Sequence, residues 1–311
     1  MSVEKIQDPG FGENSSHRIQ QRMVKNNGDY NVLLKGTKYS TKDIYIYLTK
    51  MSWKFFLSII TLAFLLINLF FACIYVGIGE EAILGASKND WLNHFWHAYF
   101  FSCQTFTTVG YGLLAPQTFT ANAVAAIEVF IGLLWFAVIT GLLYARFSRP
   151  TTRIAFSKNI IIAPYKNIKA LELRVVNERQ SPMREVNADL ILSINELRED
   201  NSVHRNYYNL QLERKNILFF PLSWTIVHPI DEVSPFFNKT KDEVLAMDIE
   251  LFVFLKGYDD TFTQTIPTSH SYLSGDLVWG ARFVRNFHTA QNGQTVLQID
   301  KNDAIETVDL T

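Results

Sequence analysis

Two long apolar stretches dominate the first half of the chain. Phe55–Val76 contains 22 residues without a charge, a proline or a glycine. Ala121–Tyr144 is a second stretch of 24 residues, interrupted by the single charge of Glu128. Crossing the roughly 30 Å hydrocarbon core of a bilayer takes about 20 helical residues. We therefore predict two transmembrane helices, over 55–76 and 121–147.

A third apolar segment lies between them but is too short to span a bilayer. Leu92–Phe106 has 15 residues, which cover about 22 Å as a helix. Asp90 stands where an N-cap is expected. A helix that ends inside the bilayer continues into non-helical backbone, which is tolerated at this depth only where protein or water surrounds it. We therefore predict a re-entrant pore helix over 92–106.

Basic residues indicate how the chain is oriented. Met1–Lys54 holds nine Lys and Arg residues, whereas Gly77–Thr120, between the spans, holds only Lys88. More basic residues follow the second span: Arg146, Arg149, Arg153 and Lys158. Loops rich in Lys and Arg stay on the cytoplasmic side. We predict a multi-pass plasma-membrane protein with both termini in the cytoplasm.

The segment before the first span is polar. Met1–Lys38 is rich in Gly, Asn and Lys, so we expect a cytoplasmic segment over 1–41 that is mostly disordered. A short helix over 42–54 would lie along the membrane surface.

The pattern of apolar and polar residues changes after Pro150. Short runs there alternate apolar and polar residues, as strands with one buried face do. Examples are Leu171–Val175, Glu250–Phe254 and Leu297–Asp300. The predicted fold class is therefore membrane α plus all-β, with a pore module over 55–147 and a β-sandwich domain over 148–311.

Composition excludes several classes of function. The net charge of -1 gives no reason to expect a nucleic-acid partner. Cys73 and Cys103 allow at most one pair, which excludes a disulfide framework, and we expect both to be small buried hydrophobic residues. No Ser/His/Asp constellation, P-loop or paired-carboxylate pattern stands out, so an enzyme is not expected.

The segment Thr108–Gly112 (TVGYG) follows closely on the predicted pore helix. A bare K⁺ ion needs oxygens in place of its water shell, and rings of backbone carbonyls supply them. Carbonyls along one strand converge on one axis only if successive dihedrals alternate in sign. Gly110 and Gly112 adopt positive φ at little cost. We expect the Thr108 hydroxyl to add an oxygen and Tyr111 to pack outward and hold the loop.

A single chain supplies only one arc of such a ring. K⁺ would bind at the selectivity-filter residues Thr108, Val109, Gly110 and Tyr111 of several copies, so the geometry requires a symmetric homotetramer. K⁺ is then the permeant ion, and no cofactor is expected.

The motif resembles the signature of potassium channels in general, and its surroundings narrow the resemblance. Tyr144–Pro150 (YARFSRP) resembles the membrane exit of inward rectifiers, and His228–Pro235 (HPIDEVSP) is similar to their HxIDExSP segment. The similarity runs from about Lys42 to Arg285. The chain resembles most the bacterial inward-rectifier potassium channels, the KirBac group.

This resemblance implies a tetramer with a two-helix pore module in the bacterial inner membrane. It also implies an immunoglobulin-like cytoplasmic domain that extends the conduit and gates it. We further expect the protein to be grouped broadly with the voltage-gated channels.

Several residues of the second span are candidates for function. A charge at a helix centre costs about 2.5–3.5 kcal/mol on insertion scales, so Glu128 must be protonated, paired or wet. The family resemblance places it behind the filter as a support, and a structural hydrogen bond to the pore helix is the other interpretation. Phe136, Thr140 and Tyr144 share one face; we expect them to line the inner cavity, with the gate near Tyr144.

Two glycines and three arginines complete the membrane candidates. Gly132 and Gly141 match the helix glycines of the family, as hinges or as close-packing points. Arg146, Arg149 and Arg153 stand at the membrane exit, where they would meet anionic lipids or only set the topology.

The resemblance also identifies Glu185 as a cytoplasmic-pore acid. Its companion position holds Lys256, and the position that is often acidic in strong rectifiers holds apolar Phe136. We therefore expect Mg²⁺ and polyamines to be weak blockers at most. His94 and His97 stand three apart on the pore helix, where we favour packing over a metal site.

We conclude from the sequence that the chain is an inward-rectifier-type potassium channel that conducts K⁺ passively. Two alternatives stay open. One is a non-selective cation channel, against which Tyr111 argues. The other is a membrane signalling receptor that does not conduct and would tolerate changes at Gly110.

Overall fold

The structure is a computed structural model that describes residues 5–15, 22–25, 28–36, 41–87, 90–148, 153–179, 181–197 and 203–310. The chain divides into two compact units. The helical unit comprises Gly36–Arg149, and the β unit comprises Met1–Lys35 together with Pro150–Thr311.

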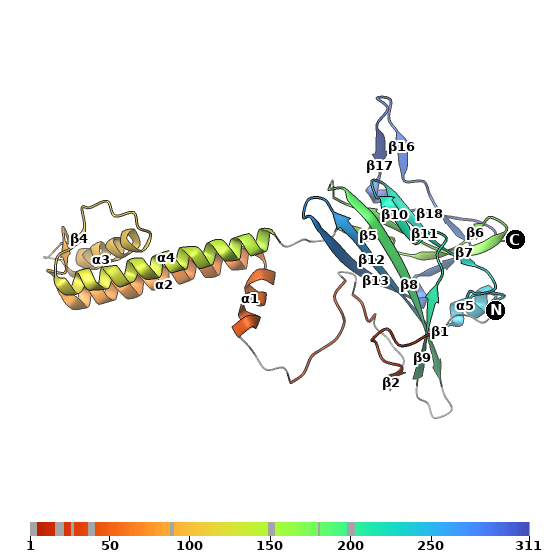
Figure 1. Cartoon of the computed structure of the whole chain (residues 1–311), viewed down its shortest axis with the longest axis horizontal. Helices are drawn as coiled ribbons and strands as arrows, with labels where there is room; N and C mark the ends of the chain where they lie inside the picture. Colours follow the sequence, from red (N-terminus) through yellow and green to blue (C-terminus); the bar gives the residue numbers. More distant parts are fainter. Residues whose placement is uncertain are drawn as a thin grey trace. The chain divides into compact units, whose positions relative to one another are not determined.

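The helical unit is built from four helices (Figure 1). They are α1 (Thr41–Lys50), α2 (Trp53–Ile78), α3 (Trp91–Phe106) and α4 (Phe119–Phe147). Two short strands, β3 (Ile83–Leu84) and β4 (Ala115–Pro116), pair antiparallel between them. Within the described residues, α2 and α4 are the two helices long and apolar enough to cross a membrane. The two predicted spans and the predicted pore helix are therefore present.

The helices α2 and α4 run antiparallel. The ring of Trp53, at the start of α2, lies 5.0 Å from that of Phe147, at the end of α4. Toward the other end of α2, Tyr75 meets Phe101 of α3 edge-on at 5.0 Å, and Ala125 of α4 belongs to the same buried cluster. The pore helix α3 thus packs against both long helices near one end of the pair, as a re-entrant helix must.

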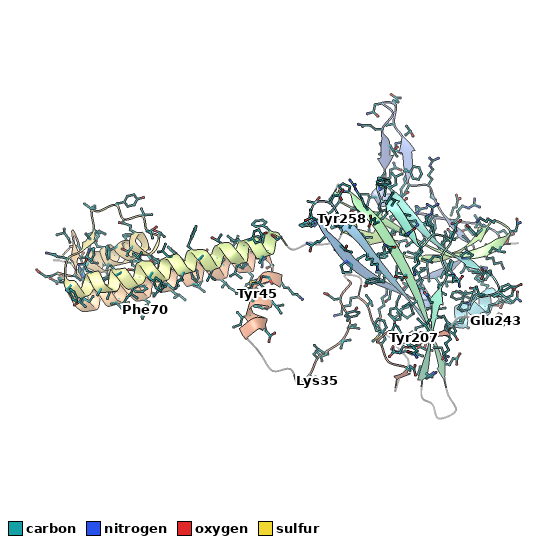
Figure 2. All side chains as sticks on the ribbon, viewed as in Figure 1. Lys35, Tyr45, Phe70, Tyr207, Glu243 and Tyr258 are labelled. Atoms are coloured by element: carbon teal, nitrogen blue, oxygen red, sulfur yellow. The ribbon has the colours of Figure 1, made fainter. Side chains whose placement is uncertain are left out.

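Most of the apolar surface of α2 and α4 is uncovered in the single chain. Figure 2 shows side chains projecting from the outer sides of both helices, with Phe70 among them, and Phe70 is 62% exposed. The expectation that both cysteines are buried is wrong for Cys73, which is exposed, while Cys103 is half-buried. Cys73 lies on the apolar outer face of α2, which lipid or neighbouring chains would cover in a membrane.

The β unit contains two sheets and smaller strand pairs (Figure 1). The seven-stranded sheet comprises β1 (Lys5–Ile6), β2 (Asn14–Ser15), β8 (Met183–Leu197), β9 (Val203–Leu210), β10 (Asn216–Phe219), β12 (Ile249–Asp259) and β13 (Gln264–Leu273). The five-stranded sheet comprises β5 (Ile154–Phe156), β6 (Ile160–Tyr165), β7 (Ile168–Asn177), β11 (Ser223–Ile230) and β14 (Leu277–Trp279). Outside the sheets lie β15 (Ala281–Phe283) with β18 (Ile305–Thr307), β16 (Phe287–Thr289) with β17 (Thr295–Leu297), and helix α5 (Lys241–Ala246).

The larger sheet has the order β1-β9-β8-β12-β13, and the smaller has the order β11-β7-β6-β14. Named strands pair antiparallel except β14 and β6, which are parallel. Leu171, Leu173 and Val175 of β7 are buried in one cluster with Leu251 and Val253 of β12. The two sheets therefore enclose a common core, and the predicted β-sandwich is confirmed.

One alternating run does not form a strand as predicted. In the run Leu297–Asp300, β17 ends at Leu297 and a 3₁₀ turn over Ile299–Lys301 follows. Four residues of alternation are too few to separate a strand from a turn.

The described parts of the N-terminal segment are ordered, so the expectation of disorder is wrong for them. β1 and β2 both pair with the edge strand β9. The Phe11 ring stacks on Phe252 at 4.4 Å, and the Val24 side chain is buried beside Tyr207 and Phe252. Edge strands have unpaired backbone groups, and this polar segment pairs with them through its own backbone.

Candidate conduction site

The pore helix α3 begins at the predicted cap. The Asp90 carboxylate accepts the Leu92 amide at 3.1 Å and the Asn93 side chain at 2.7 Å. At the other end of the helix, the Thr107 hydroxyl donates to the Cys103 carbonyl at 2.6 Å. Both ends of the helix are therefore closed by side chains, and the next residue starts the TVGYG segment.

The backbone of the TVGYG segment alternates in sign as predicted. Thr108, Gly110 and Gly112 have φ values of 58°, 52° and 83°, while Val109 and Tyr111 between them do not have positive φ. The two glycines were expected at these angles. Thr108 was not, because a residue with a Cβ pays about 1–2 kcal/mol in this region.

The start of the segment is anchored to the pore helix. The Gln104 carbonyl accepts the amides of both Val109 (2.8 Å) and Gly110 (3.3 Å). An added Cβ on Gly110 or Gly112 would meet nothing within 4 Å, so the backbone angle, and not space, requires glycine there. Tyr111 is 80% exposed in the single chain, so any packing of its ring must come from outside this chain.

Behind this segment, Glu128 of α4 joins all three large helices. Its Oε2 accepts the Tyr75 hydroxyl of α2 at 2.6 Å, and its Oε1 forms a short hydrogen bond with the Ser102 hydroxyl of α3. Ser102 also lies 3.1 Å from Asn68 Oδ1, while Asn68 Nδ2 donates to the Phe64 carbonyl at 2.8 Å. These four side chains (Asn68, Tyr75, Ser102 and Glu128), all fully buried, are called the polar cluster below.

The polar cluster includes a residue of α3 close to the point where the TVGYG segment is anchored. Ser102 lies two residues before Gln104, whose carbonyl holds the Val109 and Gly110 amides. Of the two interpretations of Glu128, the hydrogen bond to the pore helix is therefore present. Sequence reasoning missed Tyr75, Ser102 and Asn68, although Asn68 is a polar residue in an otherwise apolar span.

The two glycines of α4 differ in their surroundings. A Cβ on Gly132 would lie 2.2 Å from the Phe106 carbonyl oxygen, so this glycine permits close packing of α4 against the end of the pore helix. A Cβ on Gly141 would meet nothing within 4 Å. The structure thus gives Gly132 a packing role and assigns none to Gly141.

The three predicted cavity residues share an exposed face of α4. Phe136 and Tyr144 are both 73% exposed, and Thr140 is also exposed. Other apolar residues of α4, such as Leu133, are exposed too. Exposure in a single chain is therefore compatible with a cavity lining but does not single these residues out.

Arg146, predicted to meet lipid, is engaged inside the helical unit. Its guanidinium donates to the Leu48 and Met51 carbonyls at the end of α1, the latter at 2.7 Å. It also lies over the rings of Trp53 (4.6 Å) and Phe56 (4.3 Å) of α2. Arg146 thus ties α1 and α2 to the end of α4.

The other two arginines remain less defined. Arg149 lies outside the described residues, and Arg153 is exposed in the β unit just before β5.

The cytoplasmic-pore candidate Glu185 lies at an irregularity between β8 and β12. Its φ is 50°, and the register between the strands shifts between Lys256 and Tyr258. Lys256 pairs with Asn187, two residues from Glu185. Both Glu185 and Lys256 are exposed, and bulges of this kind redirect side chains. The structure therefore places a basic residue on the neighbouring strand, opposite a position two residues from the predicted acid.

Comparison with known proteins agrees with this architecture. Residues 154–311 match the family model of the inward rectifier potassium channel C-terminal domain. Residues 58–149 match the ion channel family model. The two models thus divide the chain much as its two compact units do.

Several curated proteins are similar over most of their length. Inward rectifier potassium channel Kirbac3.1 of Paramagnetospirillum magnetotacticum is 32% identical over 282 residues, which cover 90% of this chain and 94% of that protein. Human inward rectifier potassium channel 18 is 29% identical, covering 88% of this chain and 69% of its own. Mouse ATP-sensitive inward rectifier potassium channel 12 is 29% identical, covering 88% and 70%.

A solved structure of the Pseudomonas fluorescens DNA glycosylase AlkC overlaps 51% of this chain and 38% of its own. Its TM-score of 0.18, at 10% identity, supports no inference.

These matches also correct one expectation. Grouping the protein with voltage-gated channels is inaccurate, because the matched models and relatives are described as inward rectifiers or ion channels. By its two family models and its similarity to Kirbac3.1, the chain belongs to the inward rectifier potassium channel family, and its function is that of a potassium channel.

Proposed function

We propose that four copies of this chain assemble around one axis and conduct K⁺ selectively through a filter made by Thr108–Gly112. The observation that carries this proposal is the alternation of φ along the segment, positive at Thr108, Gly110 and Gly112. Alternation lets successive carbonyls face one axis, where they replace the water shell of the ion. K⁺ sites would lie at Thr108, Val109, Gly110 and Tyr111.

The surfaces that the single chain leaves uncovered support the tetramer. Tyr111 and Val109 are 80% and 50% exposed beside the filter, and one chain forms only one arc of a carbonyl ring. Closed cyclic symmetry completes the ring with identical surfaces. Lipid would cover the remaining apolar surface of α2 and α4. In this arrangement both termini are cytoplasmic and the membrane is the bacterial inner membrane.

Gating belongs to the far end of α4 in this proposal. Phe136, Thr140 and Tyr144 line the inner cavity, and a ring of Tyr144 side chains narrows its exit and controls its wetting. Arg146 hydrogen-bonds the end of α1, so a shift of α1 along the membrane surface would move the end of α4. Arg149 and Arg153 would meet anionic lipid headgroups.

Rectification is weak in this proposal. The position of Lys256 near Glu185 offsets the acid that would attract Mg²⁺ or polyamines, and Phe136 offers no charge to them in the cavity. K⁺ then passes in both directions with modest block from the cytoplasmic side.

A matched pair of glycine variants tests the filter. Gly110 and Gly141 both have open space where a Cβ would stand, but only Gly110 has positive φ. We expect Gly110→Ala to reduce K⁺ flux into proteoliposomes at least 100-fold, because four strained residues cost roughly 4–8 kcal/mol in total. Gly141→Ala should keep flux within about twofold, because it adds only a helix-favouring methyl.

The same assay separates the alternatives. Wild-type flux should be much greater in K⁺ than in Na⁺, because the carbonyl rings replace the water shell of K⁺. Equal fluxes would indicate a non-selective cation channel. The absence of K⁺ flux in the wild type, together with an intact fold, would favour a receptor that does not conduct.

A further inference from the structure

The loop between α2 and α3 is fastened to both the pore helix and the end of the filter. Its Ser87 peptide lies between two histidines of α3. The Ser87 amide donates to His97 Nδ1 at 2.8 Å, and the Ser87 carbonyl lies 3.0 Å from His94 Nδ1. His94 is only 5% exposed. These three residues are called the histidine clamp below.

The other side of the loop meets the chain that leaves the filter. A Cβ on Gly85 would lie 2.3 Å from the Leu113 carbonyl oxygen, directly after Gly112, so the two backbones touch there. β3 pairs with β4, and the Gln117 amide donates to the Ala82 carbonyl at 2.9 Å. The histidine clamp therefore sets the position of a loop that supports the end of the filter.

The roles of the two rings follow from the peptide between them. A backbone amide only donates and a carbonyl only accepts. His97 must therefore accept at Nδ1 and hold its proton on Nε2, whereas His94 must donate from Nδ1. A second proton on His94 leaves its contact intact. A second proton on His97 places N–H against N–H and breaks the contact.

We propose that His94 and His97 are positioning residues for conduction, and that His97 makes the filter end of the pore sensitive to protons. This inference rests on the proposed function, in which the loop faces the outside. Histidine changes charge within the physiological pH range, so acid on this side would release Ser87, loosen the loop and lower the current.

Other titratable groups lie in the same region. On α3 and its cap these are His94, Tyr99 and Asp90, and on the loop they are Glu80 and Glu81. Asp90 is occupied by Leu92 and Asn93. The remaining histidines described by the structure belong to the β unit, so buffering the two sides of the membrane separately holds them constant.

The test records single-channel currents in a planar bilayer with separately buffered baths. Acidifying the outer bath from pH 8 to pH 5 should lower the wild-type current at least tenfold, because each chain loses one hydrogen bond. In His97→Asn, the amide oxygen can accept from Ser87 but does not titrate, so the current at pH 8 should persist and the acid response should vanish. His94→Asn should retain the acid response.

A third variant separates positioning from folding. His97→Leu cannot accept from Ser87, so it should assemble normally on a sizing column yet carry a low current at both pH values. A full acid response in His97→Asn, or a normal current in His97→Leu, would overturn the proposal. A wild type without K⁺ current at any pH would instead overturn the proposed function, and is recognised before any variant is compared.

Discussion

The helical unit and the β unit handle their apolar surface in opposite ways. The β unit closes its core within one chain: Leu171, Leu173 and Val253 from the two sheets are at most 1% exposed. The helical unit leaves large residues such as Phe70 and Phe136 open, at 62% and 73% exposure. One chain therefore buries the core of its β unit by itself, whereas its helical unit leaves large apolar side chains uncovered.

The buried polar groups differ in the same way. In the helical unit the polar cluster and the histidine clamp lie around the filter end of the pore. In the β unit the buried polar residues include Arg174 on β7, His228 on β11 and Glu250 on β12. The buried polar groups of the helical unit are therefore those we expect to affect the proposed conduction path, whereas we expect those of the β unit to affect folding stability.

Of the changes that test this comparison between the two units, removing the centre of the polar cluster should have the largest effect. Glu128→Ala leaves the buried Tyr75 hydroxyl without its partner, which costs roughly 1–3 kcal/mol, and leaves Ser102 only its longer contact with Asn68. The loss is repeated in every chain, so K⁺ flux in proteoliposomes should fall at least tenfold and the assembly should melt at a lower temperature.

Glu128→Gln is the matched control. Its amide can still accept from Tyr75 and reach Ser102, so flux should stay within about threefold of wild type by this hydrogen-bond argument. If Gln were as harmful as Ala, the cluster would depend on charge, and its role as a hydrogen-bonded support of the pore helix would be wrong.

In the β unit, a buried histidine should affect stability and not selectivity. Burial, reinforced by the positive charge of the nearby Arg22, lowers the pKa of His270 from 6.5 to about 4. The folded state thus binds fewer protons than the unfolded state. The His270 contribution leaves the free energy of unfolding at its full value above pH 6.5. As the pH drops toward 4, protonation of His270 in the unfolded state lowers this free energy by about 3 kcal/mol.

His270→Phe should remove this pH dependence. The new ring can keep the stacking on Phe156, whose centroid lies 4.8 Å away. Unfolding of the full chain in detergent, followed between pH 7 and pH 4, gives the comparison. Burial raises the pKa of Glu250, so this residue also contributes to the pH dependence of unfolding. Because Glu250 is present in both proteins, the difference between their unfolding free energies reports His270 alone. Parallel curves for the two proteins would contradict the assignment.

The smallest effect concerns block from the cytoplasm. Lys256→Glu would place a second acid near Glu185, and we expect Mg²⁺ or spermine to block at about tenfold lower concentration, because each added charge pair contributes about 1 kcal/mol in water. Lys256→Gln should give an intermediate shift. An unchanged block in both variants would show that these side chains do not face the ion path.

Much of the helical unit is predictable from sequence, because its signals are long. Two apolar stretches and a capped 15-residue segment sufficed to locate α2, α3 and α4. The filter angles at Gly110 and Gly112 followed from residue type. The angle of Thr108 did not, because threonine rarely adopts positive φ and only the turn after α3 imposes it.

The weaker parts of the prediction share one cause, which is contact between distant segments. The strands β1 and β2 have two residues each and no pattern of their own, so only pairing with β9 defines them. Arg146 was expected to meet lipid or to set the topology because it stands at the membrane exit. Its contacts with Leu48 and Met51 could not be predicted, because they join residues almost 100 positions apart. The polar cluster likewise joins residues of three helices that no spacing rule connects.

The most direct test of the account is a density map of the assembled protein crystallised with Rb⁺ or Tl⁺, whose anomalous scattering marks the ions. We predict a fourfold assembly with a row of ion peaks on the axis, level with the carbonyls of Thr108, Val109, Gly110 and Tyr111. An assembly without ions between these carbonyls, or with the carbonyls turned away from the axis, would contradict it.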